Sequence, residues 1–174
     1  MIFAIPTDTC YWFACNIYNE SSYIKIFEFK NRGTNKILSI AVKNFLELEL
    51  ISKLNSSQID FLKKYPFPFT IITEMNDNFN FPSFLDRNLY KNFGIRIAEN
   101  FLTEEINEVI EFPIFLTSAN NSNEKEIYDS FELRKKFNTD EIVIFDWESP
   151  KKLTSNIFEF IWETTEMNFV RKNY

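Results

Sequence analysis

Glycine occurs only twice in this 174-residue chain, at Gly33 and Gly94. Glycine adopts left-handed backbone without strain, and the familiar phosphate-binding loops need several glycines at fixed spacing. The sequence contains neither Gly-x-x-x-x-Gly-Lys-Ser/Thr nor Gly-x-Gly-x-x-Gly. Folds that hold a nucleotide on a P-loop or on a Rossmann turn are therefore excluded for this chain.

Histidine is absent, and the two cysteines are Cys10 and Cys15. Without an imidazole, every catalytic triad or dyad that uses a histidine base is impossible, and zinc would find too few good ligands. Both cysteines are expected to be small buried hydrophobic residues rather than reactive thiols. An enzyme built from this chain would work by positioning, by electrostatics or through a carboxylate.

The charge balance is acidic, with 19 Lys and Arg residues against 25 Asp and Glu residues, a formal net charge of −6. Such a chain has no global basic field, so any contact with RNA would need a local basic patch. We find no apolar run of transmembrane length and expect no membrane association. A strand-like segment begins at residue 2 where a signal peptide would lie, so a cytoplasmic location is expected.

Strand-like and helix-like segments alternate along the chain. Strands are predicted at 2–5, 37–42, 69–73, 93–98, 113–117, 142–145, 156–161 and 168–171. Helices are predicted at 19–29, 44–51, from a Ser56 or Ser57 cap to 65, from a Thr103 cap to 111, and at 129–137. With no linker, repeat or low-complexity tract, this order predicts one α/β or α+β domain over residues 1–174, with a mixed sheet.

Two polar segments follow the first predicted elements. Pro6-Thr7-Asp8-Thr9 ends the first strand in a turn suited to a ligand, and Lys30-Asn31-Arg32 ends the first helix. Basic residues at a helix C-terminus also suit the macrodipole, so a solvated structural role is the ordinary interpretation of Lys30 and Arg32. The functional interpretation is a phosphate clamp, in which Lys supplies a mobile charge and Arg a rigid fork of donors.

Two further signals lie on later strands. Thr117-Ser118-Ala119-Asn120 follows a buried strand, where α/β sheets present ligand-binding loops, although an ordinary Asn/Ser-rich turn would look the same. Arg96 stands inside the segment Gly94-Ile95-Arg96-Ile97, and a charge in mid-strand must find a carboxylate or a ligand.

The order of these segments is more specific than any one of them. It runs Pro6-Thr7-Asp8-Thr9-x-Tyr11, Lys30-x-Arg32, Tyr65-Pro66-Phe67-Pro68-Phe69-Thr70, Gly94-Ile95-Arg96-Ile97, Thr117-Ser118-Ala119-Asn120, Thr154-Ser155-Asn156-Ile157 and Phe169-Val170-Arg171. This succession resembles the YrdC/TsaC family, the threonylcarbamoyl-AMP (L-threonylcarbamoyladenylate) synthases, over essentially the whole chain.

The resemblance implies a nucleotidyltransferase reaction in which L-threonine, bicarbonate and ATP give threonylcarbamoyl-AMP and pyrophosphate. A downstream transferase would then pass the threonylcarbamoyl group to the adenosine beside the anticodon of certain tRNAs, so contact with tRNA would be indirect or weak. It also implies a YrdC-like domain, a twisted mixed β-sheet flanked by helices around a large, positively lined substrate cavity.

The resemblance also implies roles for individual residues, and no metal-ligating side chain is among them. Lys30 and Arg32 would bind the ATP triphosphate, helped by Mg²⁺, and would be the catalytic pair. The remaining implied contacts are Ser118, Asn120 and Arg171 with ATP, and Thr9, Arg96, Ser118 and Ser155 with threonine.

The chain departs from the family pattern in several places. The family's usual N-terminal helix and the second C-terminal domain of longer relatives have no counterpart here, and Phe67 stands where a turn glycine is expected. Trp12, Trp147 and Trp162 all fall where the pattern suggests glycine. One hypothesis is that a UGA codon stands at these positions, either encoding glycine in the source and read as tryptophan, or derived from a glycine codon by one base change and encoding tryptophan. The alternative is ordinary sequence drift. UGG codons at any two of the three positions would exclude the UGA hypothesis.

Two other functions stay open at the sequence level. The same fold with lost glycines could be a non-catalytic module that binds a nucleotide or structured RNA, although the acidic balance argues against strong RNA binding. The other alternative is an enzyme of the same class that serves a different acceptor, as do the related carbamoyl-adenylate-forming domains of hydrogenase maturation. Those domains lie within much longer chains.

Overall fold

The computed structural model describes residues 1–33, 36–101, 103–122, 124–137, 140–147, 149–150 and 152–174. Within these residues the backbone forms one nine-stranded sheet in the order β7-β1-β2-β6-β3-β5-β4-β8-β9. Strand pairs β1–β7, β3–β5 and β4–β8 are parallel and the other five are antiparallel. The predicted mixed α/β sheet is confirmed.

The strands agree closely with the predicted segments, apart from one that the sequence did not indicate. They are β1 (Ile2–Pro6), β2 (Tyr11–Asn16), β3 (Ser39–Val42), β4 (Phe69–Glu74), β5 (Asn92–Ile97), β6 (Ile114–Ser118), β7 (Ile142–Ile144), β8 (Asn156–Phe160) and β9 (Met167–Arg171). The unpredicted strand is β2, which lies between β1 and β6 and is buried along nearly its whole length. A strand covered on both faces shows no alternation of polar and apolar residues, which removes the usual signal.

Five α-helices occur in the described residues: α1 (Glu20–Phe29), α2 (Phe45–Ile51), α3 (Ser56–Lys64), α4 (Glu104–Val109) and α5 (Ser130–Lys136). Each begins after a polar residue whose side chain accepts a hydrogen bond from a backbone N–H of the first turn, which stabilises the helix start. The cap of α3 is Asn55, which forms a capping box with Gln58, so the predicted Ser56 or Ser57 cap was wrong. None of the described helices is long and apolar enough to span a membrane.

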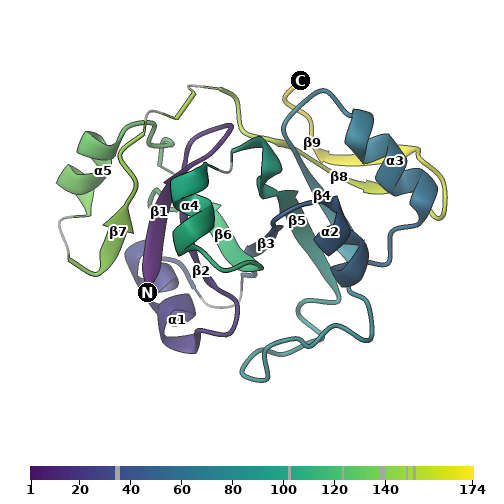
Figure 1. Cartoon of the computed structure of the whole chain (residues 1–174), viewed down its shortest axis with the longest axis horizontal. Helices are drawn as coiled ribbons and strands as arrows, with labels where there is room; N and C mark the ends of the chain where they lie inside the picture. Colours follow the sequence, from purple (N-terminus) through teal and green to yellow (C-terminus); the bar gives the residue numbers. More distant parts are fainter. Residues whose placement is uncertain (34–35, 102, 123, 138–139, 148, 151) are drawn as a thin grey trace.

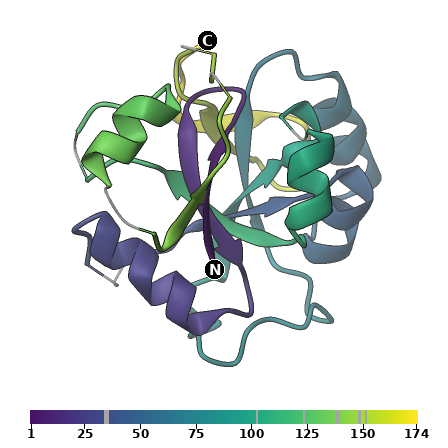
Figure 2. The same cartoon turned by 60° about the vertical axis from the view of Figure 1, so that its left-hand side comes forward.

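Figures 1 and 2 show α1 and α5 toward one end of the sheet, α2 and α3 toward the other, and α4 over the central strands. The buried apolar residues of α1, α2, α3 and α5 belong to the larger apolar cluster, and that of α4, Ile106, belongs to a smaller one. Strand residues divide between the clusters in alternation, as the two faces of a pleated sheet require.

The alternation directs several polar side chains to the face of the smaller cluster. Ile95 and Ile97 of β5 lie in the larger cluster, so Arg96 between them turns to the opposite face. Trp12 of β2 lies on that same face, in the smaller cluster, and its register partner in β6 is Ser118. This face of the central strands therefore carries the candidate site.

Candidate active site

Lys30 reaches from the end of α1 to the loop that follows β6. Its ammonium donates to the backbone oxygens of Ser118 and Asn120, the latter at 2.7 Å, and to the side-chain oxygen of Asn120 at 3.2 Å. The backbone N–H of Ser122 donates in return to the Lys30 carbonyl at 3.1 Å. The structure thus brings together the Lys-x-Arg and Ser-Ala-Asn segments, 88 residues apart in the chain.

The Lys30 ammonium is buried, with 3% of the residue exposed, and no carboxylate contacts it among the described residues. Burial, and after it the positive charge of Arg32, lowers the pKa of Lys30 from 10.5 to about 8. Neutral oxygens orient the ammonium but leave its charge uncompensated. An anion is the ligand that such a group would stabilise most.

The loop after β6 is organised by its own side chains. The Ser118 hydroxyl donates to the side-chain oxygen of Asn120 at 2.6 Å, and the amide nitrogen of Asn120 donates to the Glu124 carbonyl at 2.7 Å. Asn120 is buried and Ser118 half-buried. The loop therefore offers a fixed hydroxyl beside the Lys30 ammonium.

Arg32 lies apart from the hydrogen-bond group of Lys30. Its Nη2 donates to the Ile37 carbonyl at 3.2 Å, and its guanidinium carbon lies 5.9 Å from the ring centre of Phe27. The buried Nε has no hydrogen-bond partner among the residues that the structure describes, and burial lowers the Arg32 pKa. Asn31 takes a left-handed backbone, φ 46°, which turns the chain between the two cations. Arg32 acts on Lys30 through its charge, and within the described part of the chain the two side chains have no common hydrogen-bond partner.

Arg96 is the most deeply buried charge of the site, with 1% of the residue exposed. Its Nη2 donates to the Asp8 carboxylate, and its guanidinium carbon lies 4.8 Å from the ring centre of Trp12 and 5.9 Å from that of Phe101. Burial lowers the Arg96 pKa, while the Asp8 charge opposes this effect. The sequence predicted that Arg96 needs a carboxylate or a ligand, and the carboxylate is Asp8.

The turn that precedes β2 is closed by its own hydroxyl groups. The Thr7 hydroxyl donates to the Cys10 carbonyl at 2.9 Å and shares a hydrogen bond of 3.1 Å with Thr9. The Trp12 indole N–H donates to the Thr9 hydroxyl at 3.3 Å, and Thr9 is fully buried. Burial raises the pKa of the Cys10 thiol to about 11, so it stays protonated and inert, as predicted.

Cys15 confirms the same expectation, because it is fully buried in β2 and burial raises its pKa to about 12.

The last strands bring Ser155 and Arg171 together. Arg171 donates to the Ser155 carbonyl from Nε at 3.0 Å and from Nη2 at 2.8 Å. The buried Ser155 hydroxyl shares a 2.9 Å hydrogen bond with Thr70 of β4. After burial, the nearby charge of Arg96 is the next cause that lowers the Arg171 pKa. Two arginines therefore share this region, and among the described residues Asp8 is the carboxylate that pairs with Arg96.

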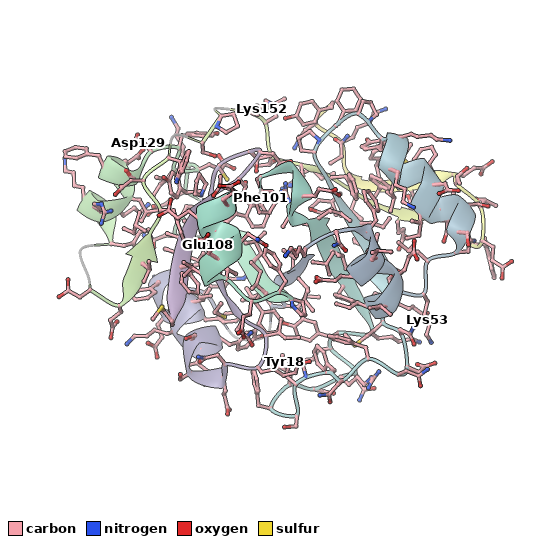
Figure 3. All side chains as sticks on the ribbon, in the orientation of Figure 1. Tyr18, Lys53, Phe101, Glu108, Asp129 and Lys152 are labelled. Carbon is pink, nitrogen blue, oxygen red and sulfur yellow. The ribbon has the colours of Figure 1, made fainter. Side chains whose placement is uncertain are left out.

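A hollow of about 250 Å³ opens beside the turn before β2. Its lining residues are Pro6, Thr7, Asp8, Phe101, Thr103, Trp147, Pro150 and Lys152. Figure 3 shows Phe101 and Lys152 at the same end of the molecule, above α4. Asp8 therefore both pairs with the buried Arg96 and lines this hollow.

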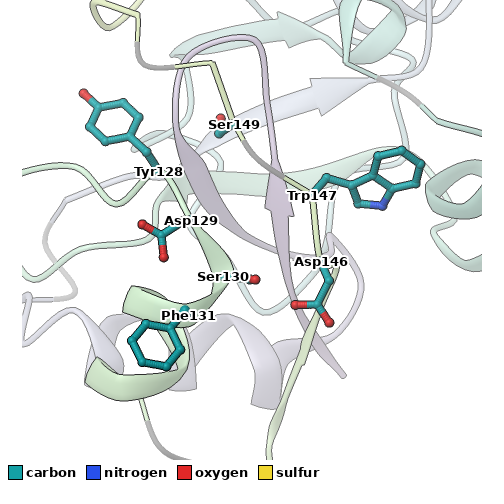
Figure 4. Close-up of a pocket in the computed structure, with 7 residues that line it drawn as sticks. All are labelled: Tyr128, Asp129, Ser130, Phe131, Asp146, Trp147 and Ser149. Atoms are coloured by element: carbon teal, nitrogen blue, oxygen red, sulfur yellow. The ribbon is translucent and has the colours of Figure 1, made fainter.

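A second hollow, of about 360 Å³, lies between the start of α5 and the segment after β7. It is lined by Tyr128, Asp129, Ser130, Phe131, Asp146, Trp147 and Ser149. In Figure 4 the Trp147 indole points away from α5, and the same residue also borders the first hollow. A single large cavity that joins the sites of all eight candidate residues stays a prediction.

Sequence reasoning missed Asp8 and Trp12 as parts of the site, although both belong to conspicuous segments. Asp8 could have been found as the carboxylate of the turn nearest a strand end, since a buried arginine requires one. Trp12 gave no usable signal, because its contact with Arg96 depends on the register of β2 against β6 and on the face to which each strand turns its side chains.

Comparison with known proteins agrees with this geometry. The chain matches the family model for Sua5, YciO and YrdC, described as telomere recombination, over residues 1–172. It is 28% identical over 140 residues to the threonylcarbamoyl-AMP synthase of Actinobacillus succinogenes, with 78% of this chain and 75% of that protein aligned. A Methanocaldococcus jannaschii relative is 33% identical over 115 residues, which are 66% of this chain and 52% of that protein.

The crystal structure of P. abyssi Sua5 complexed with L-threonine superimposes with a TM-score of 0.71 and 22% identity, over 92% of this chain and 48% of that one. This chain spans about half the length of several relatives that it matches. Because the family model covers nearly every residue and the sheet is that of the solved relatives, the chain belongs to the Sua5/YciO/YrdC family.

Proposed function

We propose that this protein is a nucleotidyltransferase that makes threonylcarbamoyl-AMP from L-threonine, bicarbonate and ATP, with release of pyrophosphate. The product would supply a downstream transferase that modifies tRNA. The observation that carries the proposal is the buried Lys30 ammonium, held by the loop of Ser118 and Asn120 without a contacting carboxylate among the described residues. Family membership and the names of relatives support it.

The reaction needs charge neutralisation more than a strong base. The threonine amine and bicarbonate first give a carbamate, in which the new N–C bond replaces a C–O bond and water leaves. A carbamate oxygen then attacks the α-phosphorus of ATP while the bond to pyrophosphate breaks. Attacking group and leaving group are both anions, so fixed positive charge and alignment supply the rate enhancement. Lys30 would hold the triphosphate directly, and Arg32 would add charge from its half-buried position. A chain without histidine can perform this chemistry.

Magnesium would enter as part of the Mg–ATP substrate. The described residues contain no group of three or more Asp, Glu, His or Cys side chains that could hold a metal. Mg²⁺ is commonly bound by substrate phosphates and water with one or two carboxylates, and we propose that it reaches this site in that form. Its contribution would be to neutralise phosphate charge.

On the threonine side, Arg96 would bind the substrate carboxylate and Thr9 its polar groups, with Ser155 and Ser118 at the edges of the site. Asn120 and Arg171 would complete the nucleotide side. These assignments rest on the resemblance and on the clustering of the side chains around the same face of the sheet.

Pyrophosphate release from ATP tests the proposal, measured with and without threonine and with and without bicarbonate. We expect release only when all three substrates are present. Release that ignores threonine would contradict the proposal, as would the absence of release from a folded protein.

Substitution of the clamp tests its residues. Lys30→Ala should reduce kcat/KM for ATP by a factor of about 100 or more, since an uncompensated buried cation contributes several kcal/mol to binding an anion. Lys25→Ala, on an exposed lysine of the same helix paired with Glu141, is the matched control and should leave turnover unchanged. Wild-type turnover in Lys30→Ala with a retained melting transition would disprove the assignment.

Arg32→Ala is expected to lower kcat/KM for ATP less than Lys30→Ala does, because Arg32 and Lys30 share no hydrogen-bond partner among the described residues. Arg87→Ala provides its control, as Arg87 is exposed and donates to the backbone carbonyls of Asn76 and Asp77 in a loop. A loss of kcat/KM equal to that of Lys30→Ala would mean that Arg32 contacts the triphosphate directly.

A non-catalytic nucleotide-binding module is the second candidate. The observation that favours it is the Trp12 indole, which lies over the Arg96 guanidinium and donates to Thr9 in the region proposed for threonine. Saturable ATP binding without threonine-dependent pyrophosphate release would favour this module over the synthase.

A further inference from the structure

The buried guanidinium of Arg96 has more hydrogen-bond donors than its surroundings use. Nη2 donates to Asp8, while Nε and Nη1 have no hydrogen-bond partner among the described residues. A guanidinium carries five N–H donors, and leaving buried donors without partners costs about 1–3 kcal/mol. Arg96 therefore has capacity for a further acceptor or for a different carboxylate.

Asp8 is located where its carboxylate could move away from Arg96. It belongs to the turn between β1 and β2, and its side chain is 14% exposed whereas that of Arg96 is 2% exposed. Asp8 borders the hollow of about 250 Å³, together with Thr103 and Lys152. A rotation of Asp8 toward the hollow would bring its carboxylate to solvent and toward the Lys152 side of the opening.

The charge around Arg96 favours an incoming anion. The positive charge of Arg96 lowers the pKa of Arg171, so the two arginines lie within electrostatic reach of each other, and among the described residues Asp8 is the carboxylate that pairs with Arg96. The faces of Trp12 and Phe101 cover the guanidinium and exclude water from it. A desolvated arginine of this kind interacts most strongly with a carboxylate that can accept two N–H bonds at once.

We propose that Asp8 is a resident carboxylate that occupies Arg96 until the carboxylate of the amino-acid substrate enters through the hollow and replaces it. Asp8 is then a positioning residue, which keeps the buried arginine paired in the empty site and releases it on binding. The identity of the incoming ligand rests on the proposed function, since threonine is the substrate that carries a carboxylate. The exchange of carboxylates at Arg96 does not depend on catalysis.

The exchange predicts that Asp8 competes with substrate. A tethered carboxylate acts at an effective concentration in the millimolar range or above, so its removal should strengthen binding of a free carboxylate to Arg96. Asp8→Asn preserves the size of the side chain and removes its charge. We expect Asp8→Asn to bind threonine with a Kd lower by roughly tenfold, while threoninamide, which has no carboxylate, gains nothing.

Thermal unfolding provides a readout that is independent of activity. Asp8→Asn should melt below wild type in chloride and recover as acetate replaces chloride at constant ionic strength, while wild type responds little. Asp77→Asn is the matched control, because Asp77 pairs at 3.0 Å with the exposed Lys53. Its melting temperature should not depend on acetate.

Each outcome is decisive for the exchange. If acetate and threonine stabilise Asp8→Asn no more than wild type, Asp8 is a fixed structural partner and the inference fails. If Asp8→Asn does not fold in chloride, the titration is repeated as refolding, where recovery of the folded signal by acetate supports the exchange and no recovery overturns it. Acetate rescue with no preference for threonine over other amino acids would keep the exchange and remove the proposed substrate.

Discussion

The charge of Lys30 can be tested by experiment, because its pKa of about 8 lies within the pH range of an enzyme assay. The ammonium charge that would bind the triphosphate is present below this pH and lost above it. We therefore predict that kcat/KM for ATP falls tenfold per pH unit once the pH exceeds about 8 in the free enzyme. Steady-state kinetics at saturating threonine and bicarbonate, over an assay range of about pH 6.5–10, would measure the fall.

Lys30→Arg separates this titration from others, since a guanidinium keeps its charge throughout the range. The variant should be less active at neutral pH, because the fork does not fit the oxygens of Ser118 and Asn120, but its profile should lose the alkaline fall. An unchanged fall in Lys30→Arg would assign the titration to another group.

The lowered pKa of Lys30 also makes the free energy of unfolding depend on pH in a defined direction. The folded pKa of Lys30 lies below its unfolded value of 10.5, so burial of the charged form is a cost that is fully present below about pH 8. As the pH rises from about 8 toward 10.5, the unfolded chain binds more protons than the folded one, and this cost is relieved.

The three tryptophans at expected glycine positions differ in backbone. Trp162 has φ 55°, in the left-handed region that favours glycine, and is 90% exposed. Trp12 and Trp147 have no positive φ, and Trp12 is buried against Arg96. The glycine pattern therefore has a conformational reason at Trp162, whereas Trp12 fills space that glycine would leave empty.

Trp162→Gly and Trp12→Gly should change stability in opposite directions. Trp162→Gly removes left-handed strain of about 1 kcal/mol and should raise Tm by a few degrees. Trp12→Gly removes a buried indole and should lower the free energy of unfolding by about 3–5 kcal/mol. Chemical denaturation of both variants checks this. Stabilisation by Trp12→Gly would mean that the indole is a poor fit in the sheet.

The sequence indicated which residues belong to the site better than it indicated which residues they contact. That Arg96 needs a carboxylate follows from the cost of burying a charge, but the choice of Asp8 depends on the folded turn. The meeting of Lys30 with the loop of Ser118 and Asn120 was expected only from the family resemblance. No local pattern predicts a contact between segments 88 residues apart.

At the scale of elements, Gly94 marks a close approach between β5 and its neighbours. A Cβ added there would lie 2.8 Å from the Thr70 methyl carbon and 3.0 Å from the Ser39 hydroxyl. Both contacts come from strands that flank β5, and the branched side chain of Thr70 has few alternative rotamers. The close approach therefore leaves little room for a methyl group.

We predict that Gly94→Ala destabilises the fold by about 1–3 kcal/mol through overpacking, although alanine has the better backbone propensity. Urea denaturation would measure the loss. The double variant Gly94→Ala with Thr70→Ser, which removes the clashing methyl, should recover part of it. Equal stability of Gly94→Ala and wild type would show that the strands can separate at no cost.

Most elements were predictable because each carries its own local signal. Four of the five helices begin near the residue that the sequence indicated, and the error at Asn55 arose because three consecutive polar residues can all cap a helix. β2 was not predicted, since a strand buried on both faces lacks alternation. The strand order could not be read from the sequence at all, because pairing between distant strands depends on the whole sheet.

At the scale of the molecule, the sheet gathers segments from the beginning, middle and end of the chain on one face. Asp8 and Trp12 come from the first hairpin, Arg96 from β5, and Arg171 from β9. This gathering places two arginines on one face, and the buried Lys30 reaches the end of β6 from α1, in a protein whose overall charge is −6. Positive charge is therefore local to the site, which suits anionic substrates and gives no broad surface for RNA.

The most direct test is formation of the adenylate from labelled bicarbonate. The protein would be incubated with ATP, Mg²⁺, threonine and ¹³C-bicarbonate, and the adenylate product examined by mass spectrometry. The proposed function predicts one ¹³C atom in a product that contains both threonine and AMP, formed in step with pyrophosphate and absent in Lys30→Ala. Pyrophosphate release without label in a threonine-containing adenylate, or no product from folded protein, would contradict it.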